Sequence, residues 1–323
     1  MIPRANRIVW YFAAGYFLCY AVYSALIKQA TSGADELPGL VLLPSVTFGT
    51  AITLPLIVTL LGWWRTSARF DRDTLIAGAA TGVIILTTTL AYTFDGVSIV
   101  FTLLLLRGGV LILAPIVDKI CGRDVRWFCW AAFLASMGAL AIALSHVRDT
   151  NMTVIAALNT CAYLASYAIR LPRMTRCAKV SDQDPTRSWF LGEMTVALAV
   201  QLIVPLGAAL LPGTAAAQLR SGITGISTTG LLIGVLYGAL YFFGTSVYLD
   251  RRENTFCVPL NRGASLLAGL VATVAIGVTP TPAELAAASL VVAALLFLSP
   301  VHHLPETFFA RLQRAMGKKE LLP

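Results

Sequence analysis

Ten stretches of about twenty mainly apolar residues, separated by short polar connections, run through this sequence. In the hydrocarbon core of a bilayer every backbone N–H and C=O must be bonded within the chain, so such stretches fold as helices. Only 12% of the residues are charged, whereas soluble domains carry about 25%. We therefore expect an all-α integral membrane protein with ten transmembrane helices, near residues 8–28, 39–63, 74–94, 97–118, 126–146, 152–171, 188–211, 229–249, 255–278 and 283–303.

The basic residues predict the orientation of these helices, because cytoplasmic connections are rich in Lys and Arg. With the N-terminus inside, 18 of the 24 Lys and Arg fall in the inner connections and termini, and only Arg148 and Arg220 fall in outer loops. We expect a multi-pass protein of the plasma membrane, in a bacterium its inner membrane, with both termini cytoplasmic. The same bias accounts for the formal net charge of +8, so we expect no nucleic-acid partner.

Two spans share an unusual pattern in which an Asp stands twelve residues before an Arg-Gly pair. The pairs are Asp95 with Arg107 and Asp250 with Arg262. Because each half has an odd number of spans, five, the two halves have opposite orientations in the membrane. This is the architecture of inverted-repeat transporters. The expected division is a first five-helix repeat at 1–148, a second, inverted five-helix repeat at 149–303, and a cytoplasmic amphipathic tail at 304–323.

A proline, two glycines and an acid follow a recognisable order around the fourth and fifth spans. Pro115 lies in the fourth span, Gly122 and Asp124 lie in the short loop after it, and Gly138 stands late in a fifth span rich in small residues. In this the sequence resembles the drug/metabolite transporter (DMT) superfamily, in particular its EamA-like ten-helix members. The resemblance covers essentially the whole chain and implies a secondary transporter.

The sequence also departs from that family pattern. The loop acid is Asp124 rather than the usual Glu, and Arg123 separates it from Gly122. In the second half the corresponding loop is replaced by a segment in which Glu284 follows Pro282. Members of the superfamily move amino acids, nucleotide sugars, phosphorylated sugars, polyamines, drugs and lipid-linked intermediates, so the resemblance does not select a substrate.

Arg107 and Arg262 lie about ten and about eight residues into their spans, roughly 15 Å and 11 Å deep. An arginine at such depth is costly and by default faces the protein interior and serves function. One interpretation is that the two arginines, one from each half, clamp an anionic group through forked hydrogen bonds, with Asn261 as a further substrate contact. The other is that each caps the carbonyls of a broken helix or pairs with an internal acid.

Three more charged residues lie in or at the ends of spans. Lys28 stands near the outer end of the first span and Arg170 near the inner end of the sixth. Both either snorkel to lipid headgroups or flank the mouths of the pathway and attract an anion. Glu193, in the seventh span, either neutralises Arg170 or Arg262 or takes up a proton during transport.

Tyrosines recur at spacings of three and four on three spans, which places each set on one helical face. Tyr20, Tyr163 and Tyr241 represent these sets as candidate substrate contacts, since a ring with a hydroxyl suits a sugar or nucleobase. The alternative is an interfacial belt or packing between helices. The sets are Tyr16, Tyr20 and Tyr23; Tyr163 and Tyr167; and Tyr237, Tyr241 and Tyr248.

The residues thus favour a secondary transporter that moves an anionic metabolite or lipid-linked intermediate, bearing phosphate or carboxylate, by alternating access. The alternatives are an exporter of amino acids or cationic drugs, or a membrane enzyme acting on lipid phosphate. Scattered acids and histidines argue against an enzyme, and we expect no cofactor and no metal. Small-residue faces at 78–82 and 234–238 serve either a homodimer or packing within the monomer.

Overall fold

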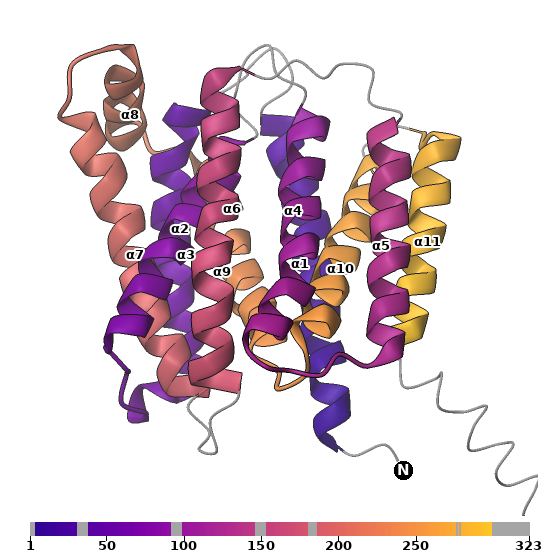
Figure 1. Cartoon of the computed structure of the whole chain (residues 1–323). Coiled ribbons are helices and arrows are strands. Elements are labelled where there is room, and N and C mark those ends of the chain that lie inside the picture. Colours follow the sequence, from indigo (N-terminus) through magenta and orange to yellow (C-terminus); the bar gives the residue numbers. More distant parts are fainter. Residues whose placement is uncertain are drawn as a thin grey trace, which may run out of the picture.

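The computed structural model describes residues 4–30, 38–91, 99–145, 153–179, 186–275, 277 and 279–298. These residues form eleven α-helices, a 3₁₀ helix and a π-helix, and none of them lies in a strand (Figure 1). The α-helices are α1 Arg4–Ala30, α2 Gly39–Leu60, α3 Arg72–Leu90, α4 Ile99–Ile120, α5 Trp127–Ser145, α6 Val154–Met174, α7 Thr186–Ala209, α8 Thr214–Thr224, α9 Thr228–Tyr248, α10 Asn254–Ala275 and α11 Pro282–Leu298. The 3₁₀ helix η1 is Trp63–Arg65 and the π-helix η2 is Thr175–Lys179.

Each expected span coincides with one of the helices α1–α7 and α9–α11. Eight of the described helices are long and apolar enough to cross a membrane, while α11 is a shorter apolar helix. The all-α class is therefore confirmed for the described residues, and the length and composition of these eight helices are compatible with a membrane protein. The stretch before α9 was expected to be a simple connection, but it contains α8. Arg220 of α8 donates to the carbonyls of Ala209, at 2.7 Å, and Leu211, at 3.2 Å, and so satisfies the free end of α7.

Polar residues at the connections start several helices. Asp71 accepts a hydrogen bond from the backbone N–H of Thr74 at 3.0 Å at the start of α3, and Thr153 does the same for Ala156 at 3.2 Å at the start of α6. Ser227 begins α9 in this way. Such side chains satisfy N–H groups that the helix leaves free. The short polar connections thus determine where the helices begin.

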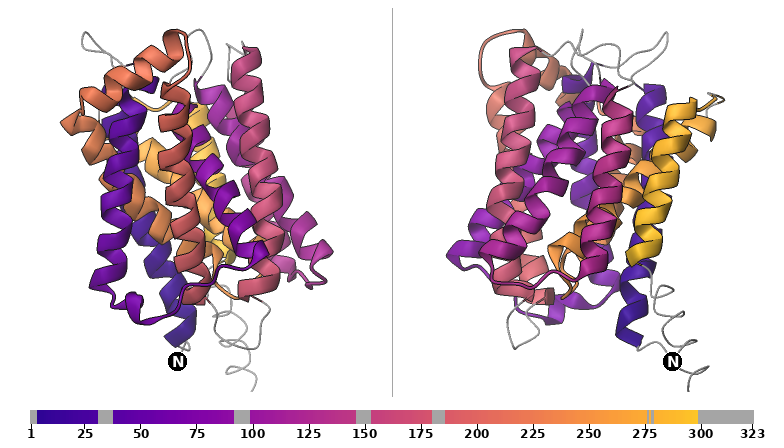
Figure 2. Two further views of the ribbon diagram at one scale, coloured as in Figure 1. Left: turned by 90° about the vertical axis from the view of Figure 1, so that its left-hand side faces the viewer. Right: turned by 45° about the vertical axis from the view of Figure 1, so that its right-hand side comes forward.

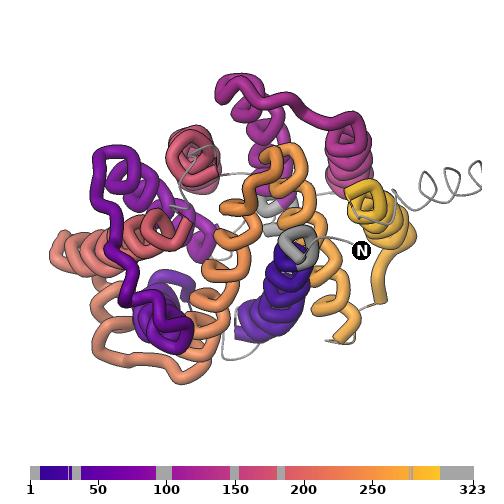
Figure 3. The backbone as a smooth tube through the Cα atoms, turned by 90° about the horizontal axis from the view of Figure 1, so that it is seen from below, coloured from indigo at the N-terminus to yellow at the C-terminus, as the bar shows by residue number. Residues whose placement is uncertain are grey.

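Helices from the two halves of the chain interleave in the bundle. α2 packs against α9, α1 against α9 and α10, α3 against α6 and α7, and α4 against α6 and α10. α5 and α11 lie side by side at one edge (Figures 1 and 3), and the two turned views in Figure 2 show the helices in one bundle with α8 at one end. Residues far apart in sequence therefore meet along the middle of the bundle.

Glycines allow the closest of these contacts. A Cβ on Gly234 of α9 would lie 2.2 Å from the carbonyl oxygen of Val46, and one on Gly49 of α2 would lie 2.3 Å from that of Leu231. The other expected small-residue face, on α3, packs against α7, where a Cβ on Gly78 would meet Val196. Both faces are thus used for packing within the chain.

Candidate functional site

A cavity lies in the middle of the bundle among α1, α3, α4, α6, α9 and α10, which come equally from the two halves of the chain. It offers about 90 Å³ to water-sized molecules. Arginines, tyrosines and a few apolar side chains line it: Arg107, Arg170, Arg262, Tyr16, Tyr20, Tyr23, Tyr163, Tyr167, Tyr237, Tyr241, Tyr248, Ile84, Ile85, Leu106 and Leu240, with Thr81, Thr88, Gly244, Thr245 and Asn261.

The tyrosine sets, which spacing left open between a ligand site, a membrane belt and packing between helices, all line this cavity. Their rings pack against one another in tilted pairs: the centroids of Tyr163 and Tyr167 are 4.9 Å apart, and those of Tyr16 and Tyr20 are 5.6 Å apart. Tyr20, Tyr163 and Tyr241 are each less than a tenth exposed. The belt interpretation is therefore wrong for these residues, and they form an aromatic lining.

Arg262 reaches the cavity from α10 and is only 6% exposed. Its guanidinium carbon lies 5.2 Å from the ring centroid of Tyr167. Its Nε and Nη2 atoms are buried and make no hydrogen bond to any described residue. The same is true of Nδ2 of the adjacent Asn261, whose Oδ1 accepts from the hydroxyl of Tyr248 at 3.1 Å. Successive residues thus bring unsatisfied N–H donors into the cavity.

The Nε and Nη2 atoms form one edge of a guanidinium, and that edge fits the two oxygens of a carboxylate. Four other described arginines bind a carboxylate through this same edge: Arg69 with Asp71, Arg126 with Glu253, Arg170 with Glu193, and Arg252 with Asp250. In Arg262 the same two atoms, Nε and Nη2, are buried but bind no carboxylate. An oxyanion is the group that would satisfy them.

Arg107 lines the same cavity from α4, as the sequence predicted, but its surroundings differ. Its Nη2 donates to the hydroxyl of Tyr20 at 2.9 Å, and its guanidinium carbon lies 5.6 Å from the Tyr20 ring centroid. The structure therefore brings the arginines of the two halves to one cavity, but not into equivalent positions.

Arg170 is buried, with 3% exposure, so snorkelling to headgroups is wrong for this residue. Its Nε and Nη2 bond to Glu193 at 2.5 and 3.3 Å, and Nη2 also donates to Thr245 at 3.2 Å. Glu193 is fully buried and accepts a further bond from Thr81 at 2.8 Å. The ion pair thus joins α3, α6, α7 and α9, and it matches the first of the two roles considered for Glu193, that of neutralising Arg170.

Several expectations fall on parts of the chain that the structure leaves undescribed. The backbone of Lys28 lies in α1, but its side chain is outside the described residues. Asp95 and the tail at 304–323 are also outside them. Within the described residues, no group of three or more His, Cys, Asp and Glu side chains could hold a metal ion.

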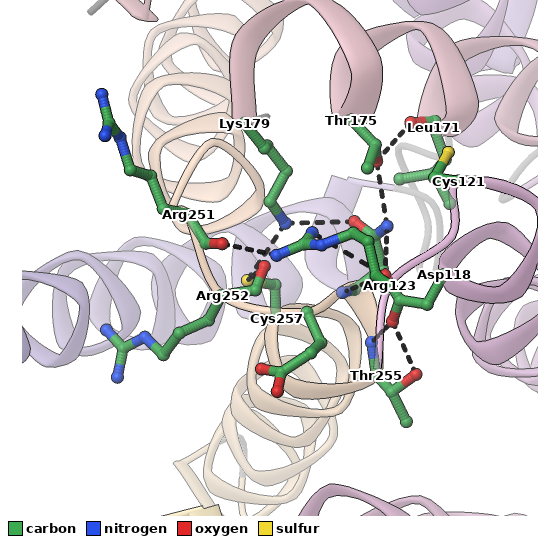
Figure 4. A network of polar contacts seen from close by, with 12 residues as sticks. Asp118, Cys121, Arg123, Leu171, Thr175, Lys179, Arg251, Arg252, Thr255 and Cys257 are labelled. Carbon is green, nitrogen blue, oxygen red and sulfur yellow. Dashed lines mark hydrogen bonds and ion pairs between the residues drawn. The ribbon is translucent and has the colours of Figure 1, made fainter. Parts of the chain in front are cut away.

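Sequence reasoning missed a second polar site, at the end of α4. Asp118 is fully buried and accepts from the backbone N–H groups of Asn254 and Thr255 at 2.9 and 2.7 Å (Figure 4). The side chains of the same two residues donate to it at 2.9 and 2.8 Å. Asp124, singled out through the family resemblance, is exposed instead. The available signal was an Asp in the last turn of an apolar span.

Comparisons with known proteins add information on the fold alone. No family model and no curated protein matches the sequence. A solved structure titled "Crystal structure of protein" is similar over 90% of this chain and 98% of its own, with a TM-score of 0.55 and 17% identity. That likeness indicates a shared fold and carries no activity.

Proposed function

We propose that this chain is a secondary transporter of the drug/metabolite type that binds an anionic group in the central cavity. In this proposal ten helices cross the bilayer as inverted repeats 1–148 and 149–303, with both termini cytoplasmic. The observation that supports it best is the buried, unsatisfied Nε/Nη2 edge of Arg262 in a cavity between the two halves.

The free energy of a buried charge explains the choice of an anion. A guanidinium without a carboxylate partner is costly in a low-dielectric interior, and an oxyanion bound to two of its nitrogens offsets that cost. Arg170 does not need a bound anion, because Glu193 already neutralises its charge. Tyrosine hydroxyls around the cavity can bond the rest of a polar ligand, while their rings cover its apolar parts.

The position of the cavity supports alternating access. Its lining comes from α1, α3 and α4 of the first half and from α6, α9 and α10 of the second. Motion of one half against the other would therefore expose it to one side of the membrane at a time, as in other inverted-repeat transporters. A cation exporter would need an unpaired acid at this place, and Glu193 is bonded to Arg170.

The test is thermal stabilisation of the purified chain by nucleotide sugars, sugar phosphates, polyprenyl phosphates, amino acids and cationic drugs, because a ligand that binds the native state raises its melting temperature. Anionic ligands should stabilise the wild type. Arg262→Gln should weaken their binding about 30-fold or more, as expected for a buried charge–charge contact. Arg107→Gln should weaken it less, because Arg107 is already bonded to Tyr20.

Arg220→Gln serves as the matched control, since Arg220 caps α7 and does not line the cavity. It should bind as the wild type does. Stabilisation by cationic drugs alone, unchanged in Arg262→Gln, would contradict the proposal. Stabilisation by anions that persists fully in Arg262→Gln would contradict the assigned site.

A further inference from the structure

A polar cluster lies at one end of the bundle, where the α4–α5 and α9–α10 connections lie, away from α8 (Figure 1). We call it the Asp118 cluster and define it by Asp118, Thr175, Lys179, Asn254 and Thr255. Asn254 Nδ2 donates to Thr175 at 2.9 Å, and Lys179 Nζ donates to Asn254 Oδ1 at 3.1 Å. All five residues are less than a tenth exposed, so this polar network lies inside the protein.

The cluster lies between the cavity and that end of the bundle. On α10 the cluster residue Asn254 precedes the cavity residue Arg262 by eight residues. After α6 the cluster residue Lys179 follows the cavity residue Arg170 by nine residues. On α4 Asp118 follows Arg107 by eleven. At 1.5 Å per residue these offsets are roughly 12–16 Å. Three lining helices thus carry a cavity residue and then a cluster residue toward the same end.

The four bonds that Asp118 accepts from Asn254 and Thr255 join one half of the chain to the other, whereas the bonds of Asn254 to Thr175 and Lys179 lie within the second half. Asp118 belongs to α4, yet it occupies the N-terminus of α10, where free N–H groups and the helix dipole favour a carboxylate. Beside the cluster, Arg126 bonds Glu253 through two nitrogens, at 2.7 and 2.8 Å. Separating the halves at this end would break the bonds to Asp118 and the Arg126–Glu253 pair.

We propose that the Asp118 cluster is the gate that closes the cavity at this end, and that Asp118 is a positioning residue that holds α10, and with it Arg262, in the closed arrangement. This inference rests on the proposed alternating access. The π-helix η2 contributes Thr175 and Lys179 to the gate, and such local irregularities are frequent at functional sites. By the predicted orientation, the gated end faces the cytoplasm.

The test measures how fast an impermeant maleimide reaches the cavity from each side of the membrane. Leu240→Cys, on the α9 wall of the cavity, is introduced into the full chain after its six native cysteines are replaced. Right-side-out and inside-out vesicles are labelled without ligand. Asp118→Ala should raise labelling from the cytoplasmic side about tenfold or more, since it removes several bonds to a charged acceptor.

Asp124→Asn is the matched control, because Asp124 is an exposed acid of the adjacent connection, and it should leave labelling unchanged. Arg126→Glu and Glu253→Arg should each raise labelling, while the double exchange should return it toward the wild-type rate, which general loosening of the fold would not do. This exchange carries the test even if Asp118→Ala fails to fold.

Wild-type labelling in both charge reversals would overturn the gate, as would a rise that the double exchange leaves in place. Because no ligand is present, this result is independent of the anion site. Failure of Arg262→Gln to weaken ligand binding would remove the proposed substrate and leave the gate standing, so the two proposals fail separately.

Discussion

Arg170 and Glu193 are bonded at two points inside the helix bundle, Nε to Oε1 at 2.5 Å and Nη2 to Oε2 at 3.3 Å. Arg262 faces the same cavity and lies over the ring of Tyr167, but the Nε and Nη2 atoms of its guanidinium make no hydrogen bond to a described residue. One arginine is therefore part of the scaffold, while the other is available to a ligand. This difference leads to opposite expectations for substitutions at the two positions.

Glu193→Gln should destabilise the protein strongly, because it leaves Arg170 as an uncompensated buried charge. Breaking a buried pair at one partner costs about 3–5 kcal/mol. The double variant Arg170→Met/Glu193→Met should recover much of that loss, because it removes both charges. Thermal melting in detergent checks this, with Asp124→Asn as an exposed control. A double variant as unstable as Glu193→Gln would contradict the role of the pair.

Arg262→Met should melt at or above the wild-type temperature in ligand-free buffer. The substitution removes a buried charge whose Nε and Nη2 atoms are unsatisfied, and a well-packed apolar side chain is often no worse than such a charge. The Arg170→Met variant should melt at a lower temperature than the wild type, because it leaves the buried carboxylate of Glu193 without its arginine partner. Measuring both variants side by side gives the comparison. Equal losses at the two arginines would indicate that Arg262 has a structural partner after all.

Gly234→Ala should disrupt the contact between α2 and α9. The new Cβ would lie 2.2 Å from the carbonyl oxygen of Val46, and backbone atoms cannot move aside as a side chain can. We expect a loss of about 1–3 kcal/mol, typical of overpacking. Gly269→Ala is the control, because Gly269 of α10 has nothing within 4 Å of a new Cβ. Alanine there should be neutral or stabilise the helix by about 0.5–1 kcal/mol.

The Arg126–Glu253 pair should make stability depend on acidity. Although partial burial raises the pKa of Glu253, the hydrogen bonds and charge of Arg126 outweigh it, and the pKa lies below its usual value. Because the pKa is lowered on folding, the pair's contribution is present above the unfolded pKa, about 4.3, and is lost as the pH falls through the folded pKa. Melting temperatures of wild type and Glu253→Gln should therefore differ at pH 7 and converge in acid. A constant difference would exclude this linkage.

The helical class and the places of the helices could be predicted from the sequence. Apolar runs of about twenty residues can satisfy their backbone in lipid only as helices, so each expected span coincides with a helix in the structure. The depth of Arg107 and Arg262 in those runs indicated that both face the interior, and both line one cavity. These predictions rested on periodicity and length, which are local properties of the chain.

Partners across helices could not be predicted in this way. The spacing of residues offered two possible partners for Glu193, Arg170 and Arg262. Only the packing of α6 against α3 and of α3 against α7 showed that the partner is Arg170. Asp118 lies in the last turn of an apolar span and Asp124 in the connection after it, but these places alone did not show that the first is buried by a partner helix and the second exposed. An acid's environment depends on which helix end lies opposite, and that is a property of tertiary packing. The sequence by itself determined which segments form long apolar helices, and the tertiary structure alone decided which buried arginine is bonded to a carboxylate and which is not.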